Sequence, residues 1–235
     1  MFGTSFEFEW GGRRWAYPDV WLSEQVEEPS PLSTGRRSTG HYTPDSDPTG
    51  MQALQYGDRY YYEGMSCEGD ELRARRIGCF QAAELLYLHA AEAGNPLAHL
   101  RLGRVYAYDR CEGGYWDRLM SWEPGADAHE PFPCDRQAYK QYLLAAQAGV
   151  AEACCGLGDM LRDGRGCEAD HARAYFWYAR AYELGASERP AVWGCAALRL
   201  GEACERGEGC ERSLEQAATW YMRACEGLRE AVRAG

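Results

Sequence analysis

The eleven cysteines are the residues of this chain with the most chemistry open to them. A cysteine thiolate can act as a nucleophile, ligate a soft metal ion or pair in a disulfide. The number is odd, and no two cysteines show the C-x-x-C spacing of a zinc site. No export signal is visible at the start of the chain, so we expect the thiols to stay reduced. The sequence therefore favours buried structural thiols over disulfides or metal ligands, and it predicts no metal site.

The other residues that could do chemistry are scattered. The five histidines form neither the H-x-x-x-H nor the H-E-x-x-H pattern of a helical metal site. The turns 164–166 and 207–209 resemble phosphate-binding loops, but they lack a preceding strand and a following Lys-Ser or Lys-Thr pair. We therefore predict a protein that is not an enzyme and uses no cofactor. The alternative is a cysteine-dependent enzyme or enzyme regulator, which requires one fast-reacting thiol.

The charge of the chain restricts its partners. The formal net charge is −11, which opposes nucleic acid or an anionic membrane as the main partner. No apolar run approaches the roughly 18–20 residues that a membrane helix needs. We expect a cytoplasmic protein whose partner is a protein or peptide.

Two recurring patterns indicate the helices that hold these residues. In the first pattern an alanine is followed by a tyrosine four residues later and by another alanine seven residues later, beginning at Ala83, Ala138, Ala174 and Ala217. Residues at these spacings share one side of a helix. Gly94, Gly149 and Gly185, eleven residues after the first alanines, are predicted to end helices in the left-handed conformation.

The second pattern is a Leu-Gly pair with an alanine five residues before the glycine. It occurs at Leu102-Gly103, Leu157-Gly158 and Leu200-Gly201, and Tyr56-Gly57 is a looser copy. The two patterns alternate, so each repeat is predicted to be helix, Gly-rich turn, helix, Gly-rich turn. The basic period of 36 residues separates Ala138 from Ala174, and the longer intervals predict loop insertions, one of them at residues 112–133.

Together, the motifs A-x-x-W/L-Y-x-x-A-A-x-x-G, A-x-x-x-L-G and G-x-G-small-x-x-D resemble the Sel-1-like repeats, which are α-solenoid relatives of the tetratricopeptide repeats. The resemblance covers roughly residues 51–226 and is strongest at 151–185. It implies an all-α, right-handed α-α superhelix, a bacterial source, and a scaffold or adaptor role. The family usually has valine where this chain has Cys67, Cys167 and Cys210, which implies that these thiols are buried small apolar groups.

The first 50 residues differ from the repeats and form a separate predicted region before the solenoid of residues 51–235. Residues 6–10 and 13–17 alternate apolar and polar side chains around Gly11-Gly12, which indicates a β-hairpin with Phe8 opposite Trp15 and Glu9 opposite Arg14. The alternative is an irregular aromatic arm. Residues 30–50 are rich in Ser, Thr, Pro and Gly, as in a linker or an irregular wrap.

Two surfaces are predicted to bind a partner. The 112–133 insertion concentrates Tyr115, Trp116 and Trp122 outside the repeat pattern, although these aromatics could instead pack on the solenoid. The concave face is the second surface, because solenoids bind extended ligands there. Its candidate residues, which could also form core packing or a solvated surface, are Lys140, Arg173, Trp177 and Arg180.

We therefore predict a non-catalytic scaffold that is a monomer or a weak homo-oligomer. A self-assembling structural repeat protein is a further alternative, in which the insertion packs on a neighbouring copy.

Overall fold

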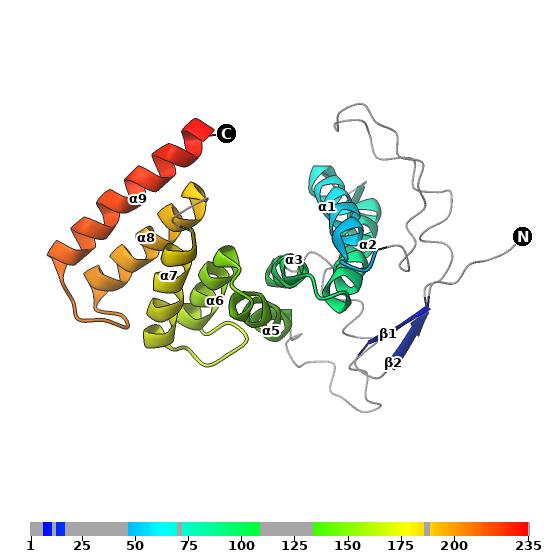
Figure 1. Cartoon of the computed structure of the whole chain (residues 1–235), viewed down its shortest axis with the longest axis horizontal. Helices are drawn as coiled ribbons and strands as arrows, with labels where there is room; N and C mark the ends of the chain where they lie inside the picture. Colours follow the sequence, from blue (N-terminus) through cyan, green and yellow to red (C-terminus); the bar gives the residue numbers. More distant parts are fainter. Residues whose placement is uncertain are drawn as a thin grey trace, which may run out of the picture. The chain divides into compact units, whose positions relative to one another are not determined.

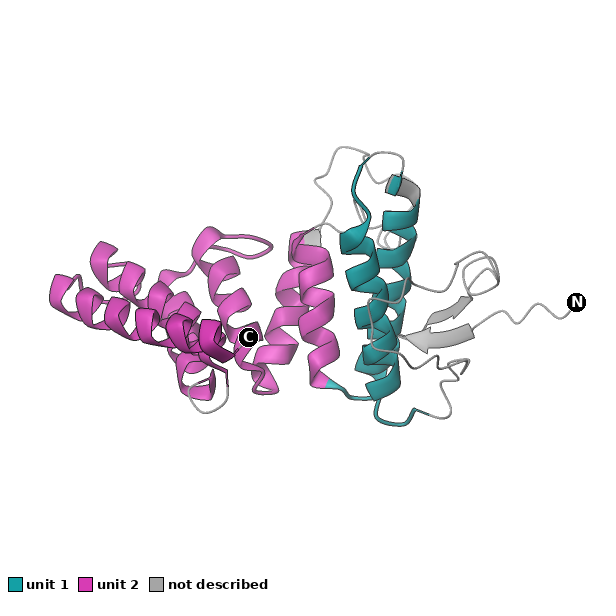
Figure 2. Cartoon of the chain, turned by 90° about the horizontal axis from the view of Figure 1, so that it is seen from above, with its two compact units in different colours: residues 1–95 teal, residues 96–235 magenta. Residues whose placement is uncertain are grey.

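The structure is a computed structural model of the chain, and it divides into two compact units, residues 1–95 and 96–235 (Figure 2). It describes the backbone of residues 7–10 and 13–16, and residues 47–69, 72–108, 134–185 and 189–234. The division at Asn95 lies within the predicted solenoid, and a separate functional region before residue 51 stays a prediction.

Unit 1 contains a hairpin and a helix pair. Strands β1 (Glu7–Trp10) and β2 (Arg13–Ala16) are antiparallel, with Phe8 opposite Trp15 and Glu9 opposite Arg14, as the alternation predicted. Helices α1 (Met51–Ser66) and α2 (Arg73–Glu92) pack against each other. The start of α1 is fixed by the buried side chain of Asp47, whose Oδ2 accepts a hydrogen bond from the backbone N–H of Ala53 at 2.8 Å.

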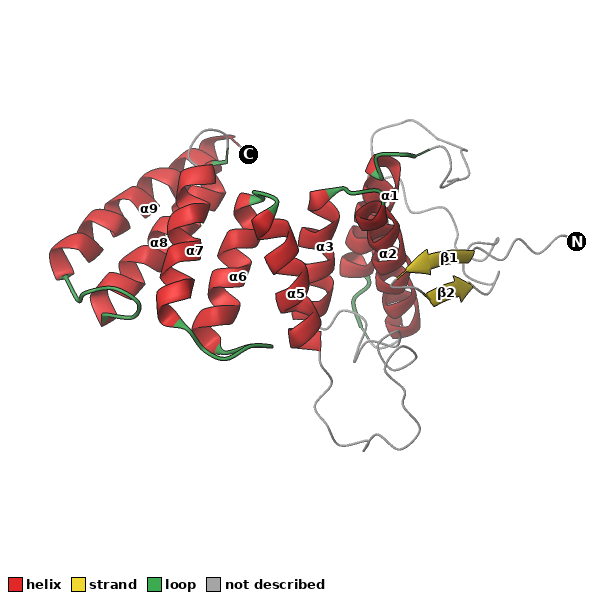
Figure 3. Cartoon of the chain, turned by 60° about the horizontal axis from the view of Figure 1, so that its bottom comes forward, coloured by secondary structure: helices red, strands yellow, loops and turns green. Residues whose placement is uncertain are grey.

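Unit 2 is a stack of helices in which each one packs against the next along the chain (Figures 1 and 3). The helices are α3 (Pro96–Ala107), α5 (Cys134–Gln147), α6 (Ala151–Asp163), α7 (His171–Gly185), α8 (Pro190–Arg206) and α9 (Leu214–Ala234). Most contacts are between sequence neighbours, as a solenoid requires. The helical repeat architecture predicted from the sequence is confirmed.

One contact recurs in every helix pair and explains both repeated patterns. The glycine of each Leu-Gly or Tyr-Gly pair lies against the ring of the repeated tyrosine on the partner helix, and an added β-carbon would meet that ring at 2.5–2.7 Å. The pairs are Gly57 with Tyr87, Gly103 with Tyr142, Gly158 with Tyr178, and Gly201 with Tyr221. The repeated alanines beside these rings are almost fully buried. A small residue on one helix and a ring on the other therefore fix each pair at close range.

The glycine turns are structural. Gly164, Gly166, Gly207 and Gly209 all adopt positive φ angles. A β-carbon at Gly166 would collide with the carbonyl oxygen of Asp135 at the start of α5, and one at Gly209 with the carbonyl oxygen of His171 at the start of α7. Each G-x-G turn therefore packs on the first residues of the preceding repeat's second helix. This contact accounts for both glycines without a phosphate ligand.

The predicted left-handed conformation is confirmed at two of three glycines. Gly94 and Gly149 have φ angles of 83° and 84°. At Gly185 the predicted helix end is confirmed, since this glycine is the last residue of α7, but the predicted left-handed conformation is wrong, because the φ angle is not positive. It faces Val192 and Trp193 of α8, where a β-carbon would lie within 3.1–3.4 Å of both residues. Close packing between helices is therefore the reason for this glycine.

Candidate functional site

Helices α3, α6 and α8 form one row along unit 2, and α5, α7 and α9 form the other. Among the described residues, the backbone of α6 approaches those of α3 and α8 more closely than α7 approaches α5 or α9. We call α3, α6 and α8 the inner row. On the other, outer row, large rings span the wider gap, as where Tyr182 of α7 meets Trp220 of α9 at 5.1 Å between ring centroids.

Ion pairs connect α6 to α8 on the inner row. Arg199 Nε lies 3.0 Å from Asp159 Oδ1, and Arg199 Nη1 lies 3.1 Å from Glu202 Oε2. Arg162 Nη1 lies 3.3 Å from the same oxygen of Asp159 and 3.9 Å from Glu202 Oε2. These four side chains are 23–38% exposed. They are therefore held in position and remain accessible to a partner.

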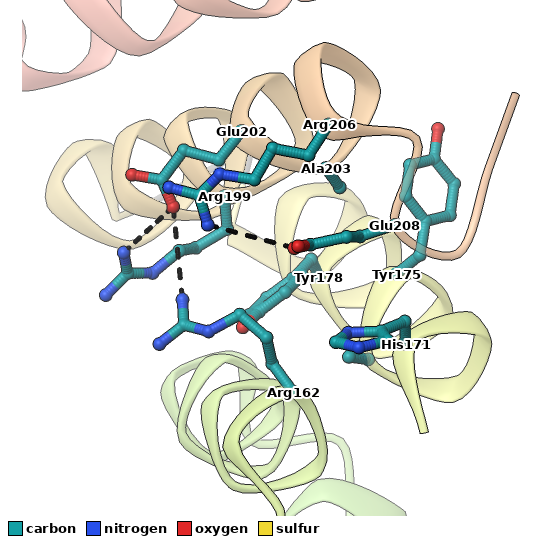
Figure 4. A pocket seen from close by; sticks show the side chains of 10 residues that line it. Arg162, His171, Tyr175, Tyr178, Arg199, Glu202, Ala203, Arg206 and Glu208 are labelled. Atoms are coloured by element: carbon teal, nitrogen blue, oxygen red, sulfur yellow. Dashed lines mark hydrogen bonds and ion pairs between the residues drawn. The ribbon is translucent and has the colours of Figure 1, made fainter. Parts of the chain in front are cut away.

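A small pocket opens beside this network, between α6, α7, α8 and the turn that follows α8 (Figure 4). Its polar lining consists of Arg162, His171, Tyr175, Tyr178, Arg199, Glu202, Arg206 and Glu208. Three guanidinium groups and two carboxylates are among them. Arg206 Nη1 lies 3.8 Å from Glu208 Oε2, a loose contact, and its side chain is 56% exposed. The pocket is thus locally rich in guanidinium groups on a chain of net charge −11.

The pKa values show the same electrostatic coupling. The hydrogen bond from Arg162 lowers the pKa of Asp163, which therefore stays ionised to lower pH. Burial and the negative charge of Asp159 together raise the pKa of Tyr178. The phenol therefore stays protonated, and its hydroxyl donates a hydrogen bond to Asp159 Oδ1 at 2.8 Å. This bond joins the Tyr178 ring of the repeat core to the charged network on the surface.

A second ionic contact lies nearer the start of the inner-row helices. One carboxylate oxygen of Glu152 on α6 pairs with Arg104 of α3 at 3.1 Å. The other oxygen pairs with Arg189, which precedes α8, at 2.8 Å. Charged side chains therefore join all three inner-row helices. Exposed pairs of this kind contribute about 0–1 kcal/mol each to stability. Most of the packing energy of unit 2 must come from its buried core.

Five of the described thiols are poor candidates for an active nucleophile. Burial raises the pKa of Cys79 to about 12, of Cys154 to about 11 and of Cys210 to about 11. Burial also raises the pKa of Cys155 and Cys167. A raised pKa leaves less of the reactive thiolate at neutral pH. In the described part of the chain, no group of three or more His, Cys, Asp or Glu side chains could hold a metal ion.

The predicted site residues fall into two sets. Tyr115, Trp116 and Trp122 lie outside the described residues, so the 112–133 surface stays a prediction. Lys140 is exposed on α5, and the other three lie on α7. Arg173 Nη2 donates to Tyr139 Oη at 3.1 Å, and Arg180 pairs with Glu183 at 3.1 Å. Trp177 is half-buried with its ring edge-on to Phe176 at 5.3 Å. All four therefore lie on the outer row, and a binding role for them stays a prediction.

Sequence reasoning did not single out the inner-row charges. Their signal is the spacing of charged positions around each Leu-Gly pair, with Asp159, Arg162 and Asp163 on α6 and Arg199, Glu202 and Arg206 on α8. These positions recur every three or four residues and so share one side of each helix. The spacing alone could not show that the two sets face each other across neighbouring repeats.

These stacked antiparallel helices define an α-solenoid repeat protein. The family model of the Sel1 repeat matches residues 151–185 and 196–227, so the chain contains Sel1 repeats in α6–α7 and α8–α9. Sel1 repeats generally form scaffolds for protein–protein interaction and are typically non-catalytic.

One solved structure with a TM-score above 0.5 agrees with this fold. The Sel1 repeat protein from Oxalobacter formigenes is 23% identical, with a TM-score of 0.54 over 78% of this chain and 61% of that one. The protective antigen c5321 of uropathogenic Escherichia coli, which displays an SLR fold, is 17% identical with a TM-score of 0.36, over 81% of this chain and 50% of that one. This chain thus spans less than two thirds of either relative. No curated protein matches the sequence. No helix in the described ranges is long and apolar enough to cross a membrane.

Proposed function

We propose that this protein is a non-catalytic adaptor that binds a protein or peptide partner on the inner row of unit 2. The observation that carries the proposal is the ionic network of Asp159, Arg162, Arg199 and Glu202, which links two repeats and borders the pocket. Its side chains are positioned before any partner arrives, so binding would lose little side-chain entropy.

The surface beside the pocket suits an acidic side chain of the partner. A carboxylate can accept paired hydrogen bonds from a planar guanidinium group, and Arg206 presents such a group, since its side chain is 56% exposed and only loosely paired with Glu208. The lining carboxylates of Glu202 and Glu208 would reject a partner with several acidic groups at the same point. The pocket therefore favours an isolated Asp or Glu within a peptide, with the 112–133 insertion as a second proposed contact surface.

The test compares a charge reversal on each row. The variant Arg206→Glu changes the most exposed guanidinium of the pocket, and Arg180→Glu makes the same change on α7, where the arginine is 49% exposed. Partners are first captured with the wild-type chain from the native host and identified by mass spectrometry. Affinity for the captured partner is then measured by calorimetry for all three proteins, after circular dichroism has shown that each is folded.

We expect Arg206→Glu to weaken binding by about ten-fold or more, which is the loss of about 1.4 kcal/mol, and Arg180→Glu to leave it unchanged. The opposite ranking would reject the inner row and support the outer-row residues predicted from the sequence. Equal affinity of all three proteins would reject both surfaces.

A further inference from the structure

Helix α9 has an exposed apolar stripe beside its buried side. Ala217, Ala224 and Gly227 are buried against the rest of unit 2. Next to them, Leu214 is 63% exposed, Met222 62%, Leu228 38% and Val232 82%. Ala218 and Cys225 are also exposed, and Tyr221 is half-buried. Apart from Met222, which lies at the edge of the stripe next to Tyr221, successive members are three or four residues apart, so they lie along one side of the helix.

The equivalent side of the previous repeat is covered. Alignment of the two repeats on Gly158 and Gly201 places Cys225 of α9 at the position of Tyr182 of α7. The ring of Tyr182 packs edge-on against Trp193 of α8 at 6.0 Å and against Trp220 of α9 at 5.1 Å. A following helix thus occupies this side of α7. In the described part of the chain the same side of α9 is open to solvent.

The stripe is self-complementary. Six of its seven members are placed symmetrically about Arg223, since Leu214 and Val232 are equally far from it, as are Ala218 and Leu228, and Tyr221 and Cys225; Met222 has no exposed counterpart. If a second α9 lies antiparallel with Arg223 at the centre, each residue of these pairs faces its counterpart. An interface between identical subunits with two-fold symmetry requires this kind of self-matching surface.

The charges that border the stripe favour the same arrangement. Glu215 lies in the first turn of α9, and Arg229 and Arg233 lie near its end, where Glu226 and Glu230 also lie. Antiparallel pairing places Glu215 of one helix near Arg229 and Arg233 of the other, whereas parallel pairing places like charges together. Antiparallel helix dipoles also attract weakly.

We propose that this stripe binds a second copy of the chain, with the two α9 helices antiparallel. The inference is independent of the adaptor function, because it uses a different helix face. One helix against another covers an area at the low end of specific interfaces, about 1,200 Å² or less in total, and the net charge of −11 adds repulsion. We therefore expect a weak dimer that forms in the micromolar range.

The first experiment measures mass against concentration by analytical ultracentrifugation of the full chain, from about 1 to 200 µM, a range that spans a micromolar Kd. We expect the weight-average mass to rise from 26.4 kDa towards twice that value.

The variant Val232→Glu should weaken association by about ten-fold or more. Phe176→Glu is the matched control, since Phe176 is 59% exposed on α7 and lies outside the stripe. A mass that stays at 26.4 kDa throughout would overturn the proposal and assign the stripe to another occupant. Equal effects of the two variants would also overturn it.

The second experiment tests the antiparallel geometry. Glu215→Arg alone, and Arg229→Glu with Arg233→Glu, should each weaken the dimer, and the triple variant should restore it. Cys225 lies close to the proposed two-fold axis. A short bismaleimide, added after the thiols have been reduced and the reductant removed, should therefore cross-link two chains through it. Cys225→Ser should abolish this product, while Cys195→Ser, which removes an exposed thiol on α8, should not. Cross-linking that persists in Cys225→Ser, or no restoration in the triple variant, would reject the antiparallel arrangement.

Discussion

The repeats at 151–185 and 196–227 have the same framework but use equivalent positions differently. In the first, Arg165 of the G-x-G turn donates to Ala107 O at 2.7 Å and to Asp135 Oδ1 at 2.6 Å, which fastens the turn to the preceding repeat. In the second, the equivalent residue is Glu208, which lines the pocket. The first repeat is covered on both sides, and the second ends in the open stripe of α9. Positions in contact with both neighbours thus carry structure, and the same positions near the end of the described chain are available for binding.

The largest loss of stability should come from substitution of the second glycine of each G-x-G turn, and it should be similar in the two repeats. Gly166→Ala and Gly209→Ala would each place a β-carbon against a backbone carbonyl at a positive φ angle. The left-handed conformation costs about 1–2 kcal/mol for alanine, and the collision adds about 1–3 kcal/mol. We expect each variant to lower the free energy of unfolding by about 2–5 kcal/mol in urea denaturation. A change below 1 kcal/mol in only one of them would break the equivalence of the two turns.

Substitution of the glycine in the glycine–tyrosine contact should have different effects on stability in the two repeats. At Gly158 an added β-carbon meets Tyr178, which is 2% exposed and bonded to Asp159. At Gly201 it meets Tyr221, a ring that is only half-buried and whose hydroxyl donates to Glu205 Oε2 at 2.6 Å in an exposed contact, so this ring is held less tightly than that of Tyr178. Overpacking costs about 1–3 kcal/mol, and alanine gains about 1 kcal/mol of helix propensity over glycine. Gly158→Ala should therefore destabilise by about 1–2 kcal/mol, and Gly201→Ala should be nearly neutral, both measured by thermal unfolding. Equal losses would show that Tyr221 is as constrained as Tyr178.

Removal of the turn charges should have a smaller effect, again unequal between repeats. Arg165→Ala deletes two hydrogen bonds, and because its side chain is 40% exposed we expect a loss of about 1 kcal/mol. Glu208→Ala removes only the loose contact with Arg206 and should change stability by less than about 0.3 kcal/mol. Hydrogen exchange at the start of α5 should accelerate in the first variant alone. Unchanged exchange there would mean that the Arg165 contacts do not hold the two repeats together.

The smallest predicted effect concerns two thiols of the second repeat. Cys204 stands at the position of Leu161, and Cys210 Sγ donates to Cys204 Sγ at 3.6 Å. Burial, followed by the contact with Cys204, raises the pKa of Cys210 from 9.0 to about 11. Maleimide labelling of Cys210 at pH 8 should therefore be slower than that of exposed Cys225, and it should accelerate as the pH rises towards 11. Below pH 9 the Cys210 thiol is protonated in both the folded and the unfolded state, and its contribution to stability is complete. This contribution is lost as the pH rises through the folded-state pKa of about 11. Fast labelling of Cys210 at pH 8 would revive the cysteine-dependent alternative.

The sequence predicted the framework well because the framework is local. The alanine, tyrosine and glycine positions act within one helix pair, so their spacing is visible in a self-comparison, as Gly158 and Tyr178 illustrate. The hairpin register was predictable for the same reason. The inner-row network was not, because Arg199 and Asp159 meet across a boundary between repeats and nothing in either helix marks the other as its partner. Gly185 was misjudged because its role depends on Trp193 of the next helix and not on its own backbone.

The contact between each G-x-G turn and the helix before it has a practical consequence for protein engineering. Because Gly166 and Gly209 lie directly against backbone, the turns that contain them have no room for added residues, and their length is the same in both repeats. The intervals between repeats differ, as shown by the 36 residues from Ala138 to Ala174 and the 43 from Ala174 to Ala217. A peptide tag or a grafted binding loop should therefore be inserted in the link between Gly185 and Arg189, where the chain already varies in length. The G-x-G turns fix the spacing of the array and should be left intact in any redesign.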